Sequence, residues 1–515
     1  MSPQLLLVSF VATLVPCFGV DVRPPLRHLG ASSRAPVALR RHDGALGLMT
    51  NWTMGDLEYW DDRVREVVAE IGLDCYPQEF EVCDQNSMLG YMAYHGMPSH
   101  YPHWSFGKAF EQTKTMYDHG VSGLPYEMVI NSDPSLAYLM RDNSLCLQIL
   151  TIAHVYGHND FFKNNFTFTS GTDARETIAS FKARADRVRS YIEDPSIGSD
   201  AVEEFLDAAH ATSFSRSRNL AIRKLKPAEH RQRLLDAAWP APDPFHRLHR
   251  TVEPTPVDLS KEPLETEADV LLFIRDHNRD LADWQKDLLT IVDEEARYFL
   301  PQIETKIMNE GWASHWHHRI MNTLDLPADV RLEFMVRHNQ VICPHPGGLN
   351  PYHVGFMVWR DIEKRFGGEH SVEGRRKLFE VRESERDVSF LRRFLTEELC
   401  RELDLFAWKP RGEHLVVSEV SDEEHWEHVK SALLRQIGTA SMPSIRIHDA
   451  NYKGRRALYL VHDHDGRDLD MTHADKTLNH LRTLWGRDCY LLTQVRGKKT
   501  LMSVTDAGFD AKLVS

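Results

Sequence analysis

Hydrophobic and polar positions change their pattern at about residue 410. Before that point, apolar residues recur at three- and four-residue spacing, which is typical of helices with one buried face. The spacing predicts helices over residues 54–71, 144–162, 173–193, 200–211, 268–277, 281–299, 301–321, 352–366 and 389–403. There is little strand signal in this part, and residues 86–143 are rich in loops and aromatic side chains. We therefore expect a mainly α-helical N-terminal domain.

The segment after Pro410 alternates between strand and helix patterns. It predicts strands over residues 414–420, 444–450, 456–463, 489–496 and 498–504, and helices over residues 423–437 and 474–485. The order βαββαβ, followed by a final hairpin strand, is that of a ferredoxin-like α+β domain. The chain is thus predicted to consist of an N-terminal segment (1–48), a helical domain (49–410) and a C-terminal α+β domain (411–507).

The N-terminal segment has the composition of a targeting leader. Residues 5–20 are apolar but too few to span a bilayer, and Pro16 interrupts them. Residues 22–42 then contain five arginines and two serines but no acidic residue, which is typical of transit peptides. A disordered extension is the alternative. No other run approaches transmembrane length, so we expect no membrane span in the mature chain.

Composition excludes several classes of function. The 515 residues are 42% hydrophobic and 26% charged, as in an ordinary soluble globular protein, and the formal net charge is −14. This charge disfavours nucleic acid as the main partner. The seven cysteines are scattered without a CxxC motif, which disfavours zinc ribbons and thioredoxin-like chemistry. The phosphate-binding, dinucleotide-binding and serine-hydrolase motifs are also missing from the sequence.

Two histidines lie in the most apolar of the predicted helices. Residues 144–162 leave almost no polar face, and a helix that is apolar all round is buried. His154 and His158 are four residues apart and therefore project from one side of this helix. A buried imidazole without a partner costs roughly 1–3 kcal/mol. Both histidines must therefore have partners in the core.

A second helix offers such a partner. In residues 301–321, Glu310 and His317 fall on a stripe where a packed core normally has leucines. A buried carboxylate needs a cation or strong hydrogen-bond donors. Two histidines from one helix and a glutamate from another form the ligand set of one class of catalytic zinc site. Val155 occupies the position that holds the general base in HExxH proteases, so that protease class is disfavoured.

These residues lead to two readings. In the first, His154, His158 and Glu310 bind a divalent metal (zinc, iron or manganese), and Glu310 and His317 take part in catalysis, His317 by orienting groups or shuttling protons. In the second, the same side chains form a structural hydrogen-bond network. The spacing of the residues does not decide between them.

A third polar group is a weaker candidate for a metal site. Glu203, Asp207 and His210 fall on one face of the helix predicted over residues 200–211. Asp207 and His210 have the carboxylate-x-x-His spacing of di-iron bundles. The simpler reading is that Asp200 and Glu203 cap the helix start, and that His210 is exposed.

Other candidates have simpler explanations. His95, His100 and His103 lie in an aromatic loop, where packing against neighbouring rings accounts for most of them. Glu294 and Glu295 supply acid groups within residues 281–299, although one of the two is expected to face water.

Six stretches of the sequence resemble the SpoVR family, which is named for a stage V sporulation protein. They are NWTMGDLEYWDD, YPHWSFGKAFEQ, AHVYGHNDFFKNN, ETKIMNEGWASHWHHRI, LNPYHVGFMVWRDIE and LFEVRESERDVSFLRRFLTEEL, in this order between about residues 50 and 410. The segment after them resembles the C-terminal region of the same family. The resemblance implies a role in spore cortex formation in spore formers and a stress-response role elsewhere.

The resemblance also implies a partner and a compartment. Family members are often encoded beside a serine protein kinase of the PrkA type, which implies a signalling partnership. They are ordinarily cytoplasmic, and the leader of residues 1–48 departs from this pattern, with organelle targeting or secretion as the alternative. The family has no settled reaction, so no catalytic role is carried over from it.

Two hypotheses of function follow. The leading one is a metal-dependent enzyme with hydrolase- or amidase-like activity at the histidine and glutamate site. The other is a non-catalytic regulatory adaptor, in which the buried polar residues fix the packing of the helices and the C-terminal domain binds the partner.

Overall fold

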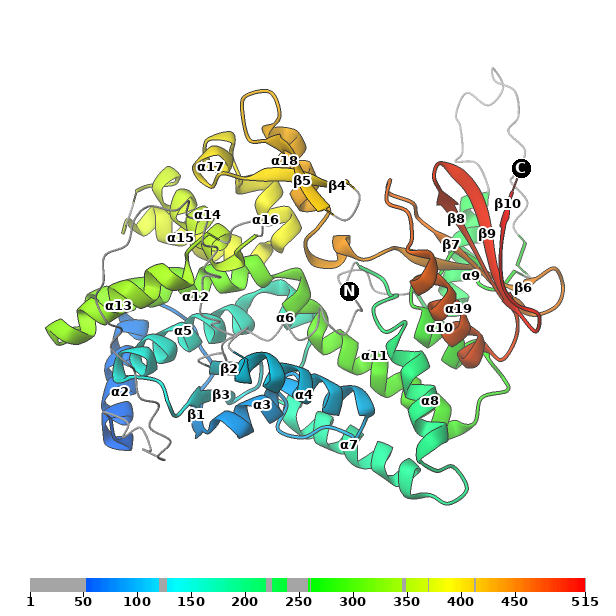
Figure 1. Cartoon of the computed structure of the whole chain (residues 1–515), viewed down its shortest axis with the longest axis horizontal. Coiled ribbons are helices and arrows are strands. Elements are labelled where there is room, and N and C mark those ends of the chain that lie inside the picture. The colour runs from blue at the N-terminus through cyan, green and yellow to red at the C-terminus, as the bar shows by residue number, and fades with distance from the viewer. Residues whose placement is uncertain are drawn as a thin grey trace, which may run out of the picture.

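A computed structural model describes residues 52–119, 127–218, 225–238, 258–259, 261–344, 349–368, 370–411 and 414–514. The predicted leader lies outside these ranges. Figure 1 shows a large, mainly helical part that continues into a smaller part built around a curved sheet, which confirms the predicted fold class. Within the described ranges, no helix is both long and apolar enough to cross a membrane.

Most of the predicted helices are present. The helices that precede the C-terminal sheet are α2 (Met54–Ile71), α3 (Gln85–Ala93), α4 (Trp104–Asp118), α5 (Leu145–Asn164), α6 (Phe166–Gly171), α7 (Thr177–Glu193), α8 (Ser199–His210), α9 (Pro227–Ala238), α10 (Val270–His277), α11 (Asp283–Glu304), α12 (Lys306–Thr323), α13 (Ala328–Val341), α14 (Pro351–Arg365), α15 (Val372–Ser384), α16 (Asp387–Phe394), α17 (Glu397–Glu402) and α18 (Trp426–Leu434). Helices α3, α4, α6, α9, α13 and α15 were not predicted.

Helices α5 and α12 form the centre of the large part and pack side by side (Figure 1). Every residue of α5 from Cys146 to Phe162 is buried, as its apolar sequence predicts. The backbones approach closely because the contact positions lack large side chains. A Cβ atom added at Gly157 of α5 would lie 2.6 Å from the Cα of Ala313 in α12. This close crossing brings the polar residues of the two helices together.

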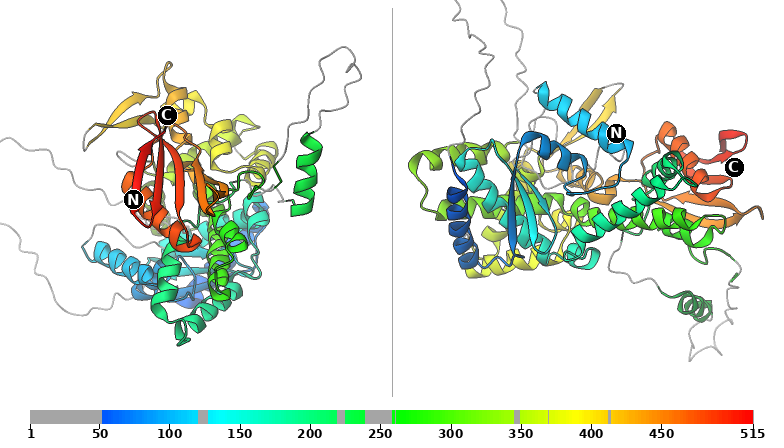
Figure 2. Two further views of the ribbon diagram at one scale, coloured as in Figure 1. Left: turned by 90° about the vertical axis from the view of Figure 1, so that its right-hand side faces the viewer. Right: turned by 90° about the horizontal axis from the view of Figure 1, so that it is seen from below.

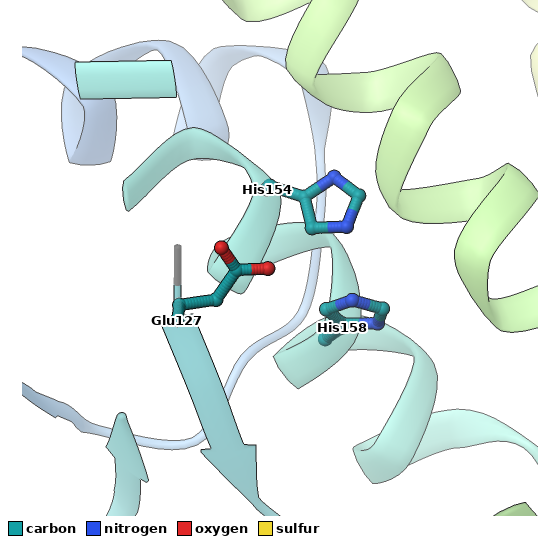
Figure 3. A group of neighbouring side chains, drawn as sticks. All are labelled: Glu127, His154 and His158. Atoms are coloured by element: carbon teal, nitrogen blue, oxygen red, sulfur yellow. The ribbon is translucent and has the colours of Figure 1, made fainter. Parts of the chain in front are cut away.

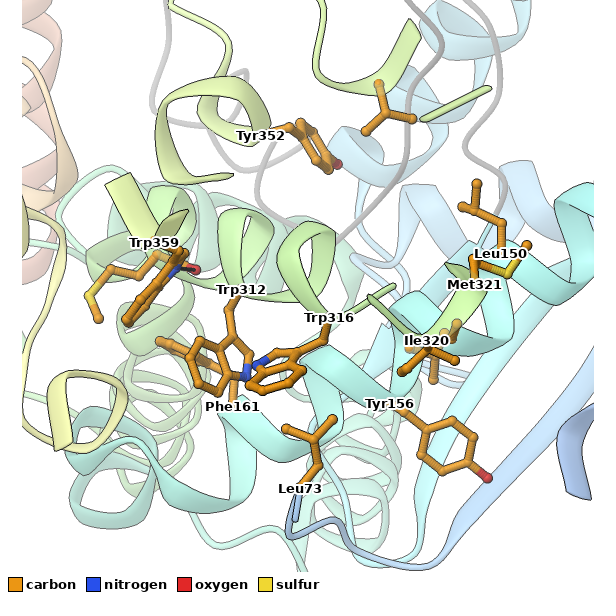
Figure 4. Packing of buried hydrophobic residues seen from close by; sticks show 14 of the residues in the cluster. Leu73, Leu150, Tyr156, Phe161, Trp312, Trp316, Ile320, Met321, Tyr352 and Trp359 are labelled. Atoms are coloured by element: carbon orange, nitrogen blue, oxygen red, sulfur yellow. Dashed lines mark hydrogen bonds between the residues drawn. The ribbon is translucent and has the colours of Figure 1, made fainter. Parts of the chain in front are cut away.

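Helix α14 covers the other side of α12 through a second close contact. A Cβ atom added at Gly311 would lie 2.3 Å from the carbonyl carbon of Gly355 in α14. Around this crossing, Trp312 and Trp316 of α12 pack with Trp359 of α14, as Figure 4 shows. The ring centroids of Trp312 and Trp359 are 4.8 Å apart, within the usual range for aromatic pairs.

A three-stranded sheet lies beside α5, although the sequence showed little strand signal before residue 410. It contains β1 (Gln78–Cys83), β2 (Glu127–Ile130) and β3 (Ser135–Met140). β3 is central, parallel to β1 and antiparallel to β2. All four residues of β2 are buried, so the strand lacks the alternation that identifies a strand from sequence. The description of residues 86–143 as mainly loops is corrected accordingly.

The C-terminal region is α+β, as predicted, and its ferredoxin-like detail stays a prediction. The five-stranded sheet has the order β10-β9-β8-β7-β6. Its elements are β6 (Ile445–Tyr452), β7 (Ala457–His462), α19 (Met471–Trp485), β8 (Cys489–Val495), β9 (Lys498–Thr505) and β10 (Gly508–Leu513). The strand predicted at residues 414–420 is β5 (His414–Val420), which pairs with β4 (Phe406–Arg411) in a separate sheet. The domain boundary at residue 410 stays a prediction.

The C-terminal sheet and part of the helical region share one hydrophobic core. Buried residues of α8, α10 and α11 cluster with those of α19 and of strands β6 to β9. In the left view of Figure 2, the sheet stands beside the green helices α10 and α11. The residues where α8 ends therefore lie between the two parts of the molecule.

Candidate metal centre

Three side chains converge between β2 and α5. Glu127 is the first residue of β2, and His154 and His158 lie one turn apart on α5 (Figure 3). One ligand atom of each residue lies within 4.8 Å of those of the other two, and all three side chains are fully buried. Figure 3 shows the carboxylate of Glu127 directed toward the two imidazoles. In the described part of the chain, no other group of three such residues meets this distance.

Glu310 approaches the same histidines from α12. Its Oε2 atom is 3.5 Å from Nε2 of His158 and 3.8 Å from Nε2 of His154. The close crossing of α5 and α12 therefore brings together the three residues that the sequence predicts as ligands. Glu127 adds a carboxylate that the sequence prediction did not include.

The other ring nitrogen of each histidine is held by a hydrogen bond. Nδ1 of His158 is 2.9 Å from Oδ1 of Asn309, an oxygen that can only accept. His158 therefore donates from Nδ1, and the lone pair of a neutral ring is left on Nε2. Nδ1 of His154 is 2.8 Å from Nδ1 of His317. Such outer hydrogen bonds fix the ring orientation of metal-binding histidines.

His317 links His154 to a third histidine, His338, so that the three side chains form a chain of hydrogen bonds. Its Nε2 atom is 2.8 Å from Nδ1 of His338 on α13. If His154 donates from Nδ1, His317 accepts at Nδ1 and donates from Nε2 to His338. One consistent set of protons thus leaves Nε2 of His154 with a lone pair, as a metal ligand requires. The predicted association of His317 with the site is an indirect one, through His154.

Burial keeps these imidazoles neutral. It lowers the pKa of His154 to about 3, although the carbonyl of Ala313 acts in the opposite direction. Burial and the neighbouring His154 lower the pKa of His158 to about 4, against the opposing effect of Glu310. The pKa of His317 lies well below its usual value for the same reasons, burial first. Neutral imidazole is the form that binds a metal.

Other buried polar residues of α5 form hydrogen bonds with protein groups, as expected of residues with a structural role. The amide of Asn159 accepts from the backbone N–H of Tyr76 and donates to its carbonyl. The carboxylate of Asp160 accepts from Arg382 at 2.6 Å and from the indole N–H of Trp312 at 2.9 Å. The Nε2 atoms of His154 and His158 form no hydrogen bond in the structure. This contrast favours ligand positions over a closed structural network.

The donor set fits a divalent transition metal. Two imidazoles and one or two carboxylates are typical ligands of zinc, iron and manganese. A divalent cation would also interact favourably with the two buried carboxylates, Glu127 and Glu310. Lys306 is the nearby cationic residue whose charge acts on Glu310. The residues present are therefore suited to hold a metal ion.

The weaker candidates Glu203, Asp207 and His210 have other roles. Glu203 and Asp207 accept from Trp104, Glu203 from its backbone N–H at 3.2 Å and Asp207 from its indole N–H at 2.8 Å. The predicted capping of α8 by acidic residues is wrong, because the helix begins after Gly198 without a side-chain cap. The prediction that His210 is exposed is also wrong. Its Nε2 atom is 2.8 Å from the hydroxyl of Tyr101 in a partly buried position.

Sequence reasoning missed Glu127, Asn309 and His338. Glu127 immediately precedes the apolar run Met-Val-Ile, and a charged residue at the start of a buried strand is an unusual signal. Asn309 neighbours Glu310 in a helix that is buried on all sides. His338 lies on α13, a helix that was not predicted. Only the first two had a signal that could have been found.

The buried His315 leads to a prediction about acid stability. Burial, together with the positive charge of Arg319, lowers the pKa of His315 to about 3. In the unfolded chain its pKa is about 6.5, so below that pH the unfolded state binds more protons. We expect the free energy of unfolding to fall by roughly 1.4 kcal/mol per pH unit from this residue alone between pH 6 and 4. Urea unfolding at several pH values, with His315→Gln as the comparison, measures this. Equal slopes for the two proteins would contradict the prediction.

Two models of one family match most of the chain. The family described as SpoVR like protein matches residues 51–442, and that described as SpoVR-like C-terminal domain matches residues 443–496. A protein of Escherichia coli strain K12, the uncharacterized protein YcgB, is 33% identical over 477 residues. The matched region covers 86% of this chain and 93% of that protein. No solved structure matches the chain.

Proposed function

The chain belongs to the SpoVR family, and we propose that it is a metal-dependent enzyme with hydrolase- or amidase-like activity. The metal is held by His154, His158 and Glu310, with Glu127 as a further ligand. The observation that carries the proposal is the convergence of these side chains while Nε2 of each histidine forms no hydrogen bond.

The residues around the centre divide into ligands and residues that position them. A bound divalent ion of this type lowers the pKa of water and polarises carbonyl oxygens. Asn309 and His317 hold the two imidazoles through Nδ1. Glu310 approaches both histidines with Oε2, and we propose it both as a ligand and as a catalytic residue. His317 is a positioning residue, because it acts through His154. Complete burial excludes bulk water and strengthens every charge interaction at the centre.

The cellular role that we propose follows the family resemblance. It comprises spore cortex formation in spore formers, a stress response elsewhere, and a partnership with a serine protein kinase of the PrkA type. In the alternative, the protein is a regulatory adaptor without catalysis, and its buried histidines serve packing alone.

Elemental analysis of the purified full chain tests the proposal. We expect about one equivalent of zinc, iron or manganese in the wild type, and a loss of most of it in His154→Ala and in Glu310→Ala. Circular dichroism and urea unfolding confirm that the variants fold. A well-folded wild type that binds no metal, even after refolding in the presence of each ion, would overturn the proposal and favour the adaptor.

A further inference from the structure

A second polar pocket lies away from the metal centre, where α4, α8 and α11 meet. It has a volume of about 90 Å³ and opens between the aromatic loop before α4 and the end of α8. Its apolar walls are formed by Phe106, Ala109, Phe214, Val292, Ala296 and Phe299. The polar residues that line it are His95, His100, Tyr101, Ser105, His210, Ser213 and Glu295. It shares no lining residue with the metal centre. An apolar pocket with a few convergent polar groups is the usual form of a small-molecule site.

Glu295 of α11 is the anchor of this pocket. Its side chain is 8% exposed, and its Oε2 atom accepts a hydrogen bond from the hydroxyl of Tyr101 at 3.1 Å. Nε2 of His100 is 3.5 Å from the same oxygen. The other oxygen, Oε1, is buried without a hydrogen-bond partner. A buried carboxylate oxygen in this state costs free energy that a ligand with a donor group would recover.

Hydrogen bonds through Tyr101 and His210 fix the orientation of the Glu295 carboxylate. The hydroxyl of Tyr101 lies between Oε2 of Glu295 and Nε2 of His210, which is 2.8 Å away. Because the carboxylate can only accept, Tyr101 donates to Glu295, and His210 then donates to Tyr101. Burial raises the pKa of Tyr101 well above its usual value, so the hydroxyl keeps its proton. Oε2 is thus occupied, and Oε1 is the atom left for a ligand.

The charge of the pocket favours a cation. Among the described residues that line it, Glu295 is the one carboxylate, and none is lysine or arginine. Burial lowers the pKa of His95 to about 3 and that of His210 well below its usual value, so both rings are neutral near pH 7. The nearby Arg184 is paired with Glu294 at 2.9 Å. An ammonium group can supply both the positive charge and the donor that Oε1 lacks.

A larger cleft continues from this pocket toward the C-terminal sheet. It has a volume of about 490 Å³ and shares His210, Ser213 and Phe214 with the pocket. Its apolar lining comes from both parts of the molecule, and includes Phe214, Met442, Ile445, Leu460, Leu478 and Leu491. The charged residues that line it are Asp465, Arg467, Asp468 and Asp470, an excess of two negative charges. The cleft can therefore take an apolar chain, and its acidic residues attract a cation.

We propose that the Glu295 pocket and the adjoining cleft form a binding site for a primary amine that carries an apolar chain. The ammonium group donates to Oε1 of Glu295, and the chain lies in the cleft between α8 and α19. The site is separate from the metal centre, and the proposal does not depend on the proposed enzyme activity.

Calorimetric titration of the full chain with three matched probes tests this proposal. We expect hexylamine to bind saturably at pH 7, hexanol to bind at least ten-fold more weakly, and hexanoate not to bind. Glu295→Gln removes the negative charge without changing the size of the side chain, and should weaken hexylamine binding at least ten-fold. Glu294→Gln is the matched control, because the adjacent Glu294 pairs with Arg184 and does not line the pocket. Its affinity should equal that of the wild type.

A second variant covers the case in which Glu295→Gln does not fold. Ser213→Leu enlarges a partly exposed side chain shared by the pocket and the cleft, and should block the passage between them. We expect it to weaken hexylamine binding while bound metal stays at the wild-type level. Hexanoate binding as tightly as hexylamine would overturn the proposal. So would unchanged hexylamine binding in a folded Glu295→Gln or Ser213→Leu, or the absence of hexylamine binding to the wild type.

Discussion

Replacing Glu127 with glutamine is expected to lower the metal affinity of the chain by at least about 100-fold, because even residues behind the ligands change such affinities 10- to 100-fold. Glu127 faces His154 and His158 from β2 in a fully buried position. Glutamine has nearly the same size and shape, so the packing of β2 is preserved. Only the negative charge is lost. The attraction between the carboxylate and the metal ion, which is strong in a core of low dielectric constant, is lost with it. Elemental analysis of chains refolded at a series of metal concentrations measures the effect.

The matched control for this variant is Glu79→Gln. Glu79 lies on β1 of the same sheet, but its side chain is exposed. The control should bind metal like the wild type and unfold at the same urea concentration. If Glu127→Gln kept its metal, Glu127 would not be a ligand. The centre would then consist of the two histidines and Glu310 alone.

The second large effect concerns Gly311, where α12 crosses α14. A methyl group added there would lie 2.3 Å from the carbonyl carbon and 2.4 Å from the Cα of Gly355. Both atoms belong to backbone, so the helices must separate and the tryptophan cluster between them must repack. We expect Gly311→Ala to cost about 3 kcal/mol or more of unfolding free energy. That is a large share of the roughly 5–15 kcal/mol that holds a typical domain together. Urea or thermal unfolding of the full chain measures it.

Gly107→Ala is the corresponding control. Gly107 lies in α4, its position is exposed, and an added Cβ atom meets no atom within 4 Å. Alanine is the better helix former by up to about 1 kcal/mol, so this variant should be as stable as the wild type or slightly more stable. Equal stability of Gly311→Ala and the wild type would mean that α12 and α14 are not packed as described.

The sequence predicted the helical half of the candidate metal centre but not the strand. Residues 144–162 have no polar face, and burial of α5 follows from that fact alone. The spacing of Glu310 and His317 on α12 likewise places both on the side that faces α5. Glu310 could be paired with the two histidines because each buried polar side chain needs a polar partner. The local patterns of two separate helices were therefore enough to predict that Glu310 lies near His154 and His158.

Glu127 could not be predicted because its position depends on contacts between distant segments. β2 has four residues and reaches α5 only by pairing with β3, whose place beside β1 is set by a parallel contact. Neither pairing has a local pattern. The pairing of the strand at residues 414–420 with β4 was missed for a related reason. The strand at residues 414–420 pairs with its immediate neighbour β4 instead of the distant sheet, and both pairings satisfy the same alternation of residues.

The complete burial of Glu127, His154 and His158 has a consequence for the speed of metal exchange. A chelator, like a substrate, can reach the ligand atoms only when the packing of α5 and α12 opens locally, so an ion held there leaves only during such openings. The frequency of such openings is set by the local free energy of unfolding, which is high in a central core. The ion would therefore exchange slowly as well as bind tightly. Its identity would be decided by whichever metal is present while the chain folds, and would persist afterwards whatever the surrounding concentrations.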